Sequence, residues 1–275
     1  MDSYADVPVL TENSWRRLRV GTVARSVLAV DFDFTGRQEA AFRHFAEVSD
    51  IDQEIWQVTQ PPESTGELVP AARYLDFWAE SPAGVAGDVD AVLGYCVGCA
   101  FLPELARRIA RTQQRPPALV LFDPEPMVAA SLYQDFKKTI DVMSILSAQE
   151  KQRLLTEAGR ICENSGSFTT AATEITSLYE ETVGTAFTRL GMDESLQSEF
   201  TDMFRSYVSY LAAASELAAE TQAGWQAGIA LTSRQSSPGA RHASREIRFP
   251  VSAAELLRDV RVTDAVFDLL EEIRG

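Results

Sequence analysis

The sequence predicts an α/β protein: a mostly parallel sheet covered by helices and interrupted by one large helical insertion. Three observations lead to this fold class. Apolar strand-like segments alternate with amphipathic segments up to residue 122, helical spacing alone fills residues 128–222, and a strand pattern returns at residue 228. Alternating strands and helices are typical of a parallel sheet with helices on both faces.

Composition narrows the class of protein. The chain has 275 residues, of which 45% are hydrophobic, so it can bury a sizeable core. Its 25 basic and 40 acidic residues give a net charge of -15, which disfavours binding to nucleic-acid phosphates. Three cysteines do not make a disulfide framework, and no segment has the pattern of a signal peptide or a membrane span. We expect a cytoplasmic protein that binds neither nucleic acid nor membranes.

The first half of the chain contains the predicted strands and the helices between them. Each predicted strand is a short apolar run bounded by turn residues. The expected strands are 15–20 at an edge, then 27–32, 55–58, 90–94 and 118–122. The expected helices are 38–48, 68–80 and 100–112.

Residues 128–222 read as a set of helices. The first has a stripe that includes Phe136, a capping box at 147–150 opens the second, Gly191 ends the third, and Asp193 caps the fourth. A helical segment of this length after a sheet strand is typical of a lid. We therefore divide the chain into a core, residues 1–127 and 223–275, and a lid, residues 128–222. The core resumes with strands 228–233 and 245–251 and a helix over 262–273.

The most informative stretch joins the strand 90–94 to the next helix. It contains Gly94, Cys96 and Gly98 in a Gly-x-Cys-x-Gly pattern, the layout of a nucleophile elbow with cysteine in place of serine. Glycine suits the flanking positions because the chain reverses sharply there and a side chain would clash. We expect the central thiol to stand at a helix N-terminus, which favours its thiolate. A buried, inert cysteine is the alternative.

Cys96 and Cys99 also form a C-x-x-C pair. The only histidines are His44 and His242, and no second pair of cysteines exists, so we expect no metal and no cofactor. A thioredoxin-like redox pair remains an alternative.

The order of these parts resembles the α/β-hydrolase thioesterases of nonribosomal peptide and polyketide biosynthesis, over residues 26–275. The resemblance implies the α/β-hydrolase fold, Cys96 as the nucleophile and Asp123 as the acid that follows the next strand. It also implies an oxyanion hole made by the backbone N–H groups of Thr35 and Val97. The residues alone allow a second reading of Asp123, because Asp-Pro commonly opens a turn.

The resemblance breaks at the third catalytic position. The family has a histidine between the last strand and the last helix, where this chain has Ala253. Alanine cannot accept a proton, so the site is expected to be impaired, through either an engineered change or a natural loss. His242 lies before the last strand, and a strand of about seven residues spans roughly 23 Å, which disfavours it as the base. His44 falls near no predicted site.

The resemblance implies an acyl hydrolase or acyltransferase. Its substrates would be acyl thioesters on an acyl or peptidyl carrier protein, or on coenzyme A, and it would hydrolyse, transfer or cyclise the acyl group. A non-catalytic acyl-binding or scaffold protein is the alternative. Lid residues Phe136, Phe200 and Tyr207 suggest an apolar channel for the acyl group. Arg107, Arg108 and Arg111 form either a solvated face or a surface for an acidic carrier protein.

Overall fold

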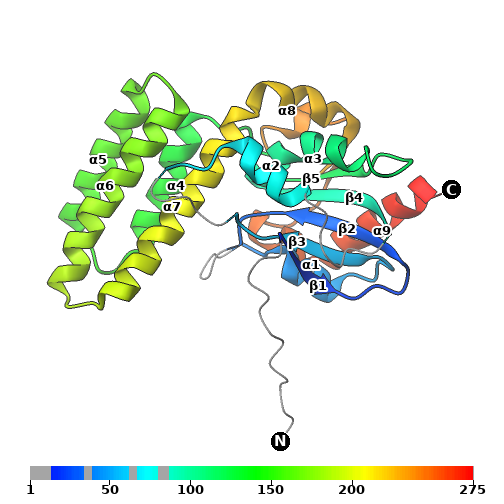
Figure 1. Cartoon of the computed structure of the whole chain (residues 1–275), viewed down its shortest axis with the longest axis horizontal. Helices are drawn as coiled ribbons and strands as arrows, with labels where there is room; N and C mark the ends of the chain where they lie inside the picture. The colour runs from blue at the N-terminus through cyan, green and yellow to red at the C-terminus, as the bar shows by residue number, and fades with distance from the viewer. Residues whose placement is uncertain (1–13, 34–38, 62–66, 80–86, 275) are drawn as a thin grey trace, which may run out of the picture.

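A central β-sheet organises the protein (Figure 1). The computed structural model describes residues 14–33, 39–61, 67–79 and 87–274. Within these residues the sheet has seven strands in the order β1-β3-β2-β4-β5-β6-β7. β1 is antiparallel to β3, and the other neighbouring strands are parallel. The prediction of a mostly parallel sheet is therefore confirmed.

Every strand lies within or next to a segment that the sequence predicts to be a strand. The strands are β1 (Trp15–Arg19), β2 (Arg25–Val30), β3 (Glu54–Val58), β4 (Asp88–Tyr95), β5 (Ala118–Phe122), β6 (Gly228–Thr232) and β7 (Arg245–Arg248). β7 is shorter than predicted. Its ladder stops after Phe249 donates to the Thr232 carbonyl at 2.8 Å, because Pro250 has no N–H to continue it.

Helices cover both faces of the sheet. Successive strand residues point to opposite faces, so Val27 packs with α1 (Phe42–Val48) and α9 (Val260–Arg274), whereas Leu28 belongs to the cluster on the other face. That second face carries α2 (Ala71–Ala79), α3 (Leu102–Ile109) and α8 (Ala218–Gly224). The sheet is thus buried between two layers, as its apolar strands require.

The helical insertion stands to one side of the sheet as a bundle of four helices (Figure 1). They are α4 (Ala129–Val142), α5 (Ala148–Asn164), α6 (Phe168–Arg189) and α7 (Glu194–Glu216). The Ser147 and Asp193 side chains cap α5 and α7 as predicted, and Gly191 follows α6 with a φ of 65°. α7 returns to the core, where it contacts α2 and the turn after β4.

The boundary of the insertion differs slightly from the predicted lid. α8 begins inside residues 128–222 but packs against α3 of the core. The division into a core and a lid domain at residues 128 and 222 stays a prediction. None of the helices in the described parts of the chain is long and apolar enough to cross a bilayer.

Candidate active site

The turn after β4 has the strained backbone that the Gly-x-Cys-x-Gly pattern predicts. Cys96 has a φ of 51°, in the left-handed region that a non-glycine residue rarely adopts. Residues Cys96–Phe101 form a 3₁₀ turn before α3 begins at Leu102. Such strain persists only where the surroundings enforce it, and it is often found at functional sites.

The flanking glycines are needed because backbone and side chains press on the turn. A Cβ added at Gly98 would lie 2.3 Å from the Val30 carbonyl oxygen and 2.9 Å from the Tyr210 hydroxyl. A Cβ at Gly94 would lie 2.6 Å from the Leu102 side chain and 2.9 Å from the Cys99 backbone. The close packing of the turn against β2 and α3 thus leaves no room for a side chain at either position.

The Cys96 thiol is half-buried and lies against a carboxylate. Its Sγ donates to Oε2 of Glu125 at 3.5 Å. Burial raises the pKa of this thiol well above its ordinary value, and the charges of Glu125 and Asp135 raise it further. The Val97 amide lowers it, with a smaller effect. The amide at the start of the turn thus favours the thiolate, as expected, but burial and the charges of Glu125 and Asp135 outweigh it.

Two lid helices bring further polar groups toward the thiol. Asp135 on α4 pairs with Lys138 at 3.2 Å, and its charge raises the pKa of the Cys96 thiol. Burial raises the pKa of Tyr207 on α7, and the charges of Asp135 and Cys96 raise it further. The Tyr207 ring lies 5.2 Å from that of Phe32, which follows β2.

Two residues assigned to an apolar channel pack elsewhere. The Phe136 ring contacts that of Phe204 at 6.0 Å inside the lid bundle, and the Phe200 ring contacts that of Phe187 at 5.6 Å. Their helical spacing therefore reflects the packing of the bundle. Of the three lid residues, only Tyr207 lies near the turn that carries Cys96.

Asp123 stands at the end of β5, next to the end of β4. Tyr95 and Phe122 are paired across these two strands, so Cys96 and Asp123 leave the same edge of the sheet at neighbouring places. Asp123 Oδ1 accepts the Ser233 amide at 2.9 Å. Its Oδ2 is buried and has no hydrogen-bond partner among the described residues. A histidine in the family's arrangement would donate to such an oxygen.

Ala253 lies at the same edge. The Arg234 amide donates to the Val251 carbonyl at 2.7 Å, directly after Ser233, the residue that anchors Asp123. The Ala40 amide donates to the Ala254 carbonyl at 2.9 Å, and Ala253 itself is exposed. The segment that would carry the family's histidine is thus placed beside the aspartate, but it carries only a methyl group.

No described contact joins either histidine of the chain to the Cys96 thiol. His242 precedes β7, and the nearby Ser244 amide donates to Gly228 at the amino end of β6. The His242 ring lies 6.4 Å from that of Trp225. His44 accepts the Ala41 amide through Nδ1 at 3.0 Å, at the start of α1. The turn that contains His242 is tied to the end of β5 as well, because the His242 amide donates to the Gly239 carbonyl at 3.0 Å and the Gly239 amide donates to the Pro124 carbonyl at 2.9 Å. His44 caps a helix.

Several other predicted residues take structural roles or fall outside the described residues. Thr35 lies outside them, so the oxyanion hole with Val97 stays a prediction. Cys99 is fully buried, and its Sγ donates to the Gly94 carbonyl at 3.1 Å. No group of histidine, cysteine and acidic residues that could hold a metal ion occurs in the described part of the chain.

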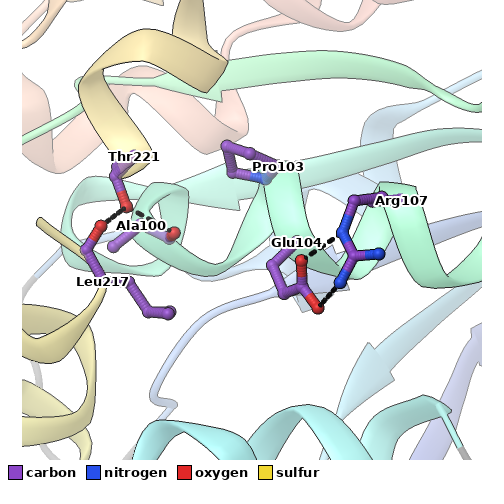
Figure 2. Close-up of a pocket in the computed structure, with 6 residues that line it drawn as sticks. All are labelled: Ala100, Pro103, Glu104, Arg107, Leu217 and Thr221. Carbon is purple, nitrogen blue, oxygen red and sulfur yellow. Dashed lines mark hydrogen bonds and ion pairs between the residues drawn. The ribbon is translucent and has the colours of Figure 1, made fainter. Parts of the chain in front are cut away.

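A small cavity of about 180 Å³ lies between α3 and α8, and Cys96 is not among the residues that line it (Figure 2). Arg107 pairs with Glu104 at its edge (Figure 2). Arg108 pairs with Glu104 at 2.9 Å and also with Asp76. Because these two arginines already have partners in their own chain, the solvated-face interpretation of α3 is favoured over carrier docking.

No family model and no curated protein matches the chain. The Vlm2 thioesterase domain with genetically encoded 2,3-diaminopropionic acid, bound with a dodecadepsipeptide, matches with a TM-score of 0.51 and 18% identity over 94% of this chain and 97% of that one. A haloalkane dehalogenase variant, DbeA-M1 from Bradyrhizobium elkanii, matches with a TM-score of 0.53 and 11% identity over 94% and 93% of the two chains.

This protein has the α/β-hydrolase fold. A third match is AB3403, a four-domain nonribosomal peptide synthetase, with a TM-score of 0.52 and 13% identity. It covers 95% of this chain but 20% of the synthetase. In this fold the turn that carries Cys96 follows β4, and Asp123 follows the neighbouring strand β5.

The burial of Asp123, whose Oδ2 has no hydrogen-bond partner among the described residues, should make the stability of the protein depend on pH. Burial raises the pKa of Asp123 above its ordinary value of 3.8, and the Ser233 amide opposes the shift. The folded protein therefore binds this proton more tightly than the unfolded chain, and stability is lost as pH rises through the folded-state pKa. We expect Asp123→Asn to raise the free energy of unfolding at pH 7 by about 1 kcal/mol, because a neutral amide costs less to bury than a charge.

Urea unfolding of wild type and Asp123→Asn between pH 3 and pH 7 measures this effect. The advantage of the variant should be smallest at pH 3 and should grow as pH rises. Asp268→Asn on the exposed face of α9 is the control, and its effect should stay within about 0.5 kcal/mol. A variant that is less stable than wild type at pH 7 would show that Asp123 has a stabilising partner.

Proposed function

We propose that this α/β-hydrolase-fold protein accepts an acyl group on Cys96 from an acyl thioester. The observation that supports this most is the strained turn that holds the thiol against the Glu125 carboxylate at the carboxyl edge of the sheet. The likeness to thioesterase domains favours substrates carried on the phosphopantetheine arm of an acyl or peptidyl carrier protein, or on coenzyme A.

The proposed chemistry has two halves that differ in their need for a base. In the first, the sulfur attacks the acyl carbonyl, and the thiol of the donor leaves, so one thioester is exchanged for another. In the second, water or another acceptor must be deprotonated to release the acyl group. Ala253 cannot supply that base. We therefore propose that the acyl group is added to Cys96 faster than water removes it, so that acyl-Cys96 accumulates. The protein is then an impaired thioesterase, or it passes its acyl group to a better nucleophile than water.

The proposal is tested by intact-mass measurement after incubation with acetyl- and octanoyl-pantetheine thioesters. Wild type should gain the mass of one acyl group, and Cys96→Ala should gain none. Cys162→Ala is the matched control, because Cys162 is a half-buried thiol on α5 of the lid, and this variant should be acylated like wild type. An adduct that survives in Cys96→Ala, or no adduct in wild type, would contradict the proposal.

The raised pKa of Cys96 supports a second candidate, an acyl-binding protein without chemistry. A thiol that stays protonated attacks slowly. In this case an unreactive amide analogue of octanoyl-pantetheine should bind equally well to wild type and to Cys96→Ala, and no covalent adduct should form. Calorimetric titration of both proteins with the analogue, read beside the mass measurement, separates the two candidates.

A further inference from the structure

A carboxylate outside the sequence motifs touches the candidate nucleophile. Glu125 lies two residues after Asp123, and its Oε2 is 3.5 Å from Cys96 Sγ. In the described part of the chain, no other side chain lies within hydrogen-bond distance of that sulfur. The contact joins the loop after β5 to the turn after β4, so it depends on the pairing of these strands.

The loop around Glu125 is held firmly in place. Pro124 and Pro126 restrict the backbone on both sides of it. The Glu125 amide donates to the Cys96 carbonyl at 3.4 Å, and the Gly239 amide donates to the Pro124 carbonyl at 2.9 Å. Because the backbone of Glu125 is bonded to that of Cys96 itself, the two residues are held side by side, with their side chains in contact.

We propose that Glu125 is the catalytic base for acyl transfer to Cys96. This inference rests on the proposed function. Oε2 takes the proton of the Cys96 thiol as Sγ forms a bond with the acyl carbonyl carbon. The resulting tetrahedral oxyanion collapses, the bond from the carbon to the donor sulfur breaks, and the departing thiolate takes the proton from Glu125. The acyl group, the proton and the electron pairs are all accounted for, and Glu125 ends as a carboxylate.

The chemistry of the pair explains why a cysteine stands at this position. A carboxylate is a weak base, with an ordinary pKa of about 4.3, and a thiol has one of about 8.5. Because burial raises the pKa of Cys96 well above the ordinary value, the proton transfer is strongly uphill by itself and must accompany the attack of sulfur on the carbonyl. A serine hydroxyl is a far weaker acid, and a carboxylate alone would not activate it. A thiol beside a glutamate thus suits acyl transfer in a site that has no histidine.

The effect of Glu125 on the thiol must be distinguished from the effects of the other charged and titratable groups near it. They are Asp135 and Lys138 of α4, Tyr207 and Tyr210 of α7, and Cys99 in the turn. Asp135 provides the matched control. Its charge, like that of Glu125, raises the pKa of the thiol, but no described contact joins it to the sulfur.

The test compares Glu125→Gln with Asp135→Asn in two assays. Alkylation by iodoacetamide, measured against pH, reports the acidity of Cys96. Both variants lose a negative charge, so both should be alkylated with a midpoint at lower pH than wild type. Acylation by octanoyl-pantetheine, followed by intact mass, reports base catalysis. We expect Glu125→Gln to be acylated at least about tenfold more slowly than wild type, whereas Asp135→Asn is acylated at least as fast as wild type.

Loss of the negative charge should speed acylation of Cys96, whereas loss of the base should slow it, so the sign of the change in rate tests the inference. If Glu125 acts only through its charge, Glu125→Gln should be acylated as fast as Asp135→Asn, and that result would refute the base. Glu125→Asp, which keeps a carboxylate, should recover part of the rate, and a rate equal to that of Glu125→Gln would also count against it. If wild type is alkylated but never acylated, the proposed function fails, and this inference fails with it.

Discussion

Replacing Ala253 with histidine should raise the hydrolytic turnover of an acyl-pantetheine thioester by about 10²–10⁴-fold. The segment before residue 253 is bonded to Arg234, next to the Ser233 amide that anchors Asp123. An imidazole introduced there could donate to the buried Asp123 Oδ2, which has no partner among the described residues. Its other nitrogen could then take a proton from the water that attacks the acyl-cysteine.

Steady-state release of free thiol, together with loss of the acyl-enzyme mass, measures this gain. The double variant Ala253→His with Asp123→Asn is the control, because the amide cannot stabilise an imidazolium in the same way, and most of the gain should disappear. Unchanged turnover in a folded Ala253→His variant would favour the acyl-binding candidate. A gain that persists without the Asp123 carboxylate would show that Asp123 is not the acid of this site.

Gly98→Ala should destabilise the protein by about 3 kcal/mol, near the upper end of the usual range for overpacking. The new methyl carbon would lie 2.3 Å from the Val30 carbonyl oxygen, a backbone atom of the central strand β2. It would also lie 2.9 Å from the hydroxyl of Tyr210, whose ring stacks on Phe101 at 5.0 Å. To relieve this steric overlap, the turn must move away from the sheet, and Cys96 must move with it.

Urea unfolding and the rate of Cys96 alkylation measure both consequences. Gly184→Ala is the matched control. Gly184 lies inside α6, and nothing lies within 4 Å of the position of its added Cβ. There alanine should stabilise the protein by roughly 0.5–1 kcal/mol, because a glycine in a helix costs conformational entropy. A Gly98→Ala protein as stable as wild type would mean that the turn is not pressed against β2.

The predictions made from the sequence agree best with the structure where they depend on only a few neighbouring residues. Short apolar runs bounded by turn residues predict the strands of the sheet, and the capping residues Ser147 and Asp193 predict two helix starts in the insertion. The glycines around Cys96 predicted a sharp turn because their requirement is set within a few residues of chain. Helix ends were less accurate: α1 begins at Phe42, four residues after the predicted start, and α3 begins at Leu102 after a 3₁₀ turn.

The state of the thiol could not be predicted in the same way. The helix-terminus argument considered only the residues that follow Cys96, whereas its pKa is raised by burial, by Glu125 from another strand end and by Asp135 from the lid. One signal was present in the sequence: a second carboxylate two residues after Asp123, fixed between prolines. Its importance depends on the pairing of β4 with β5, which places two loops side by side.

The sequence by itself determined the alternation of strands and helices, the helical insertion, the strained turn at Cys96 and the missing histidine at residue 253. These features follow from periodicity, from glycine and from residue identity. Only the tertiary structure decided that Glu125 touches the thiol and that one oxygen of Asp123 is left buried without a described partner. Such contacts join residues distant in sequence, and they exist only after the strands have paired and the insertion has folded back onto the core.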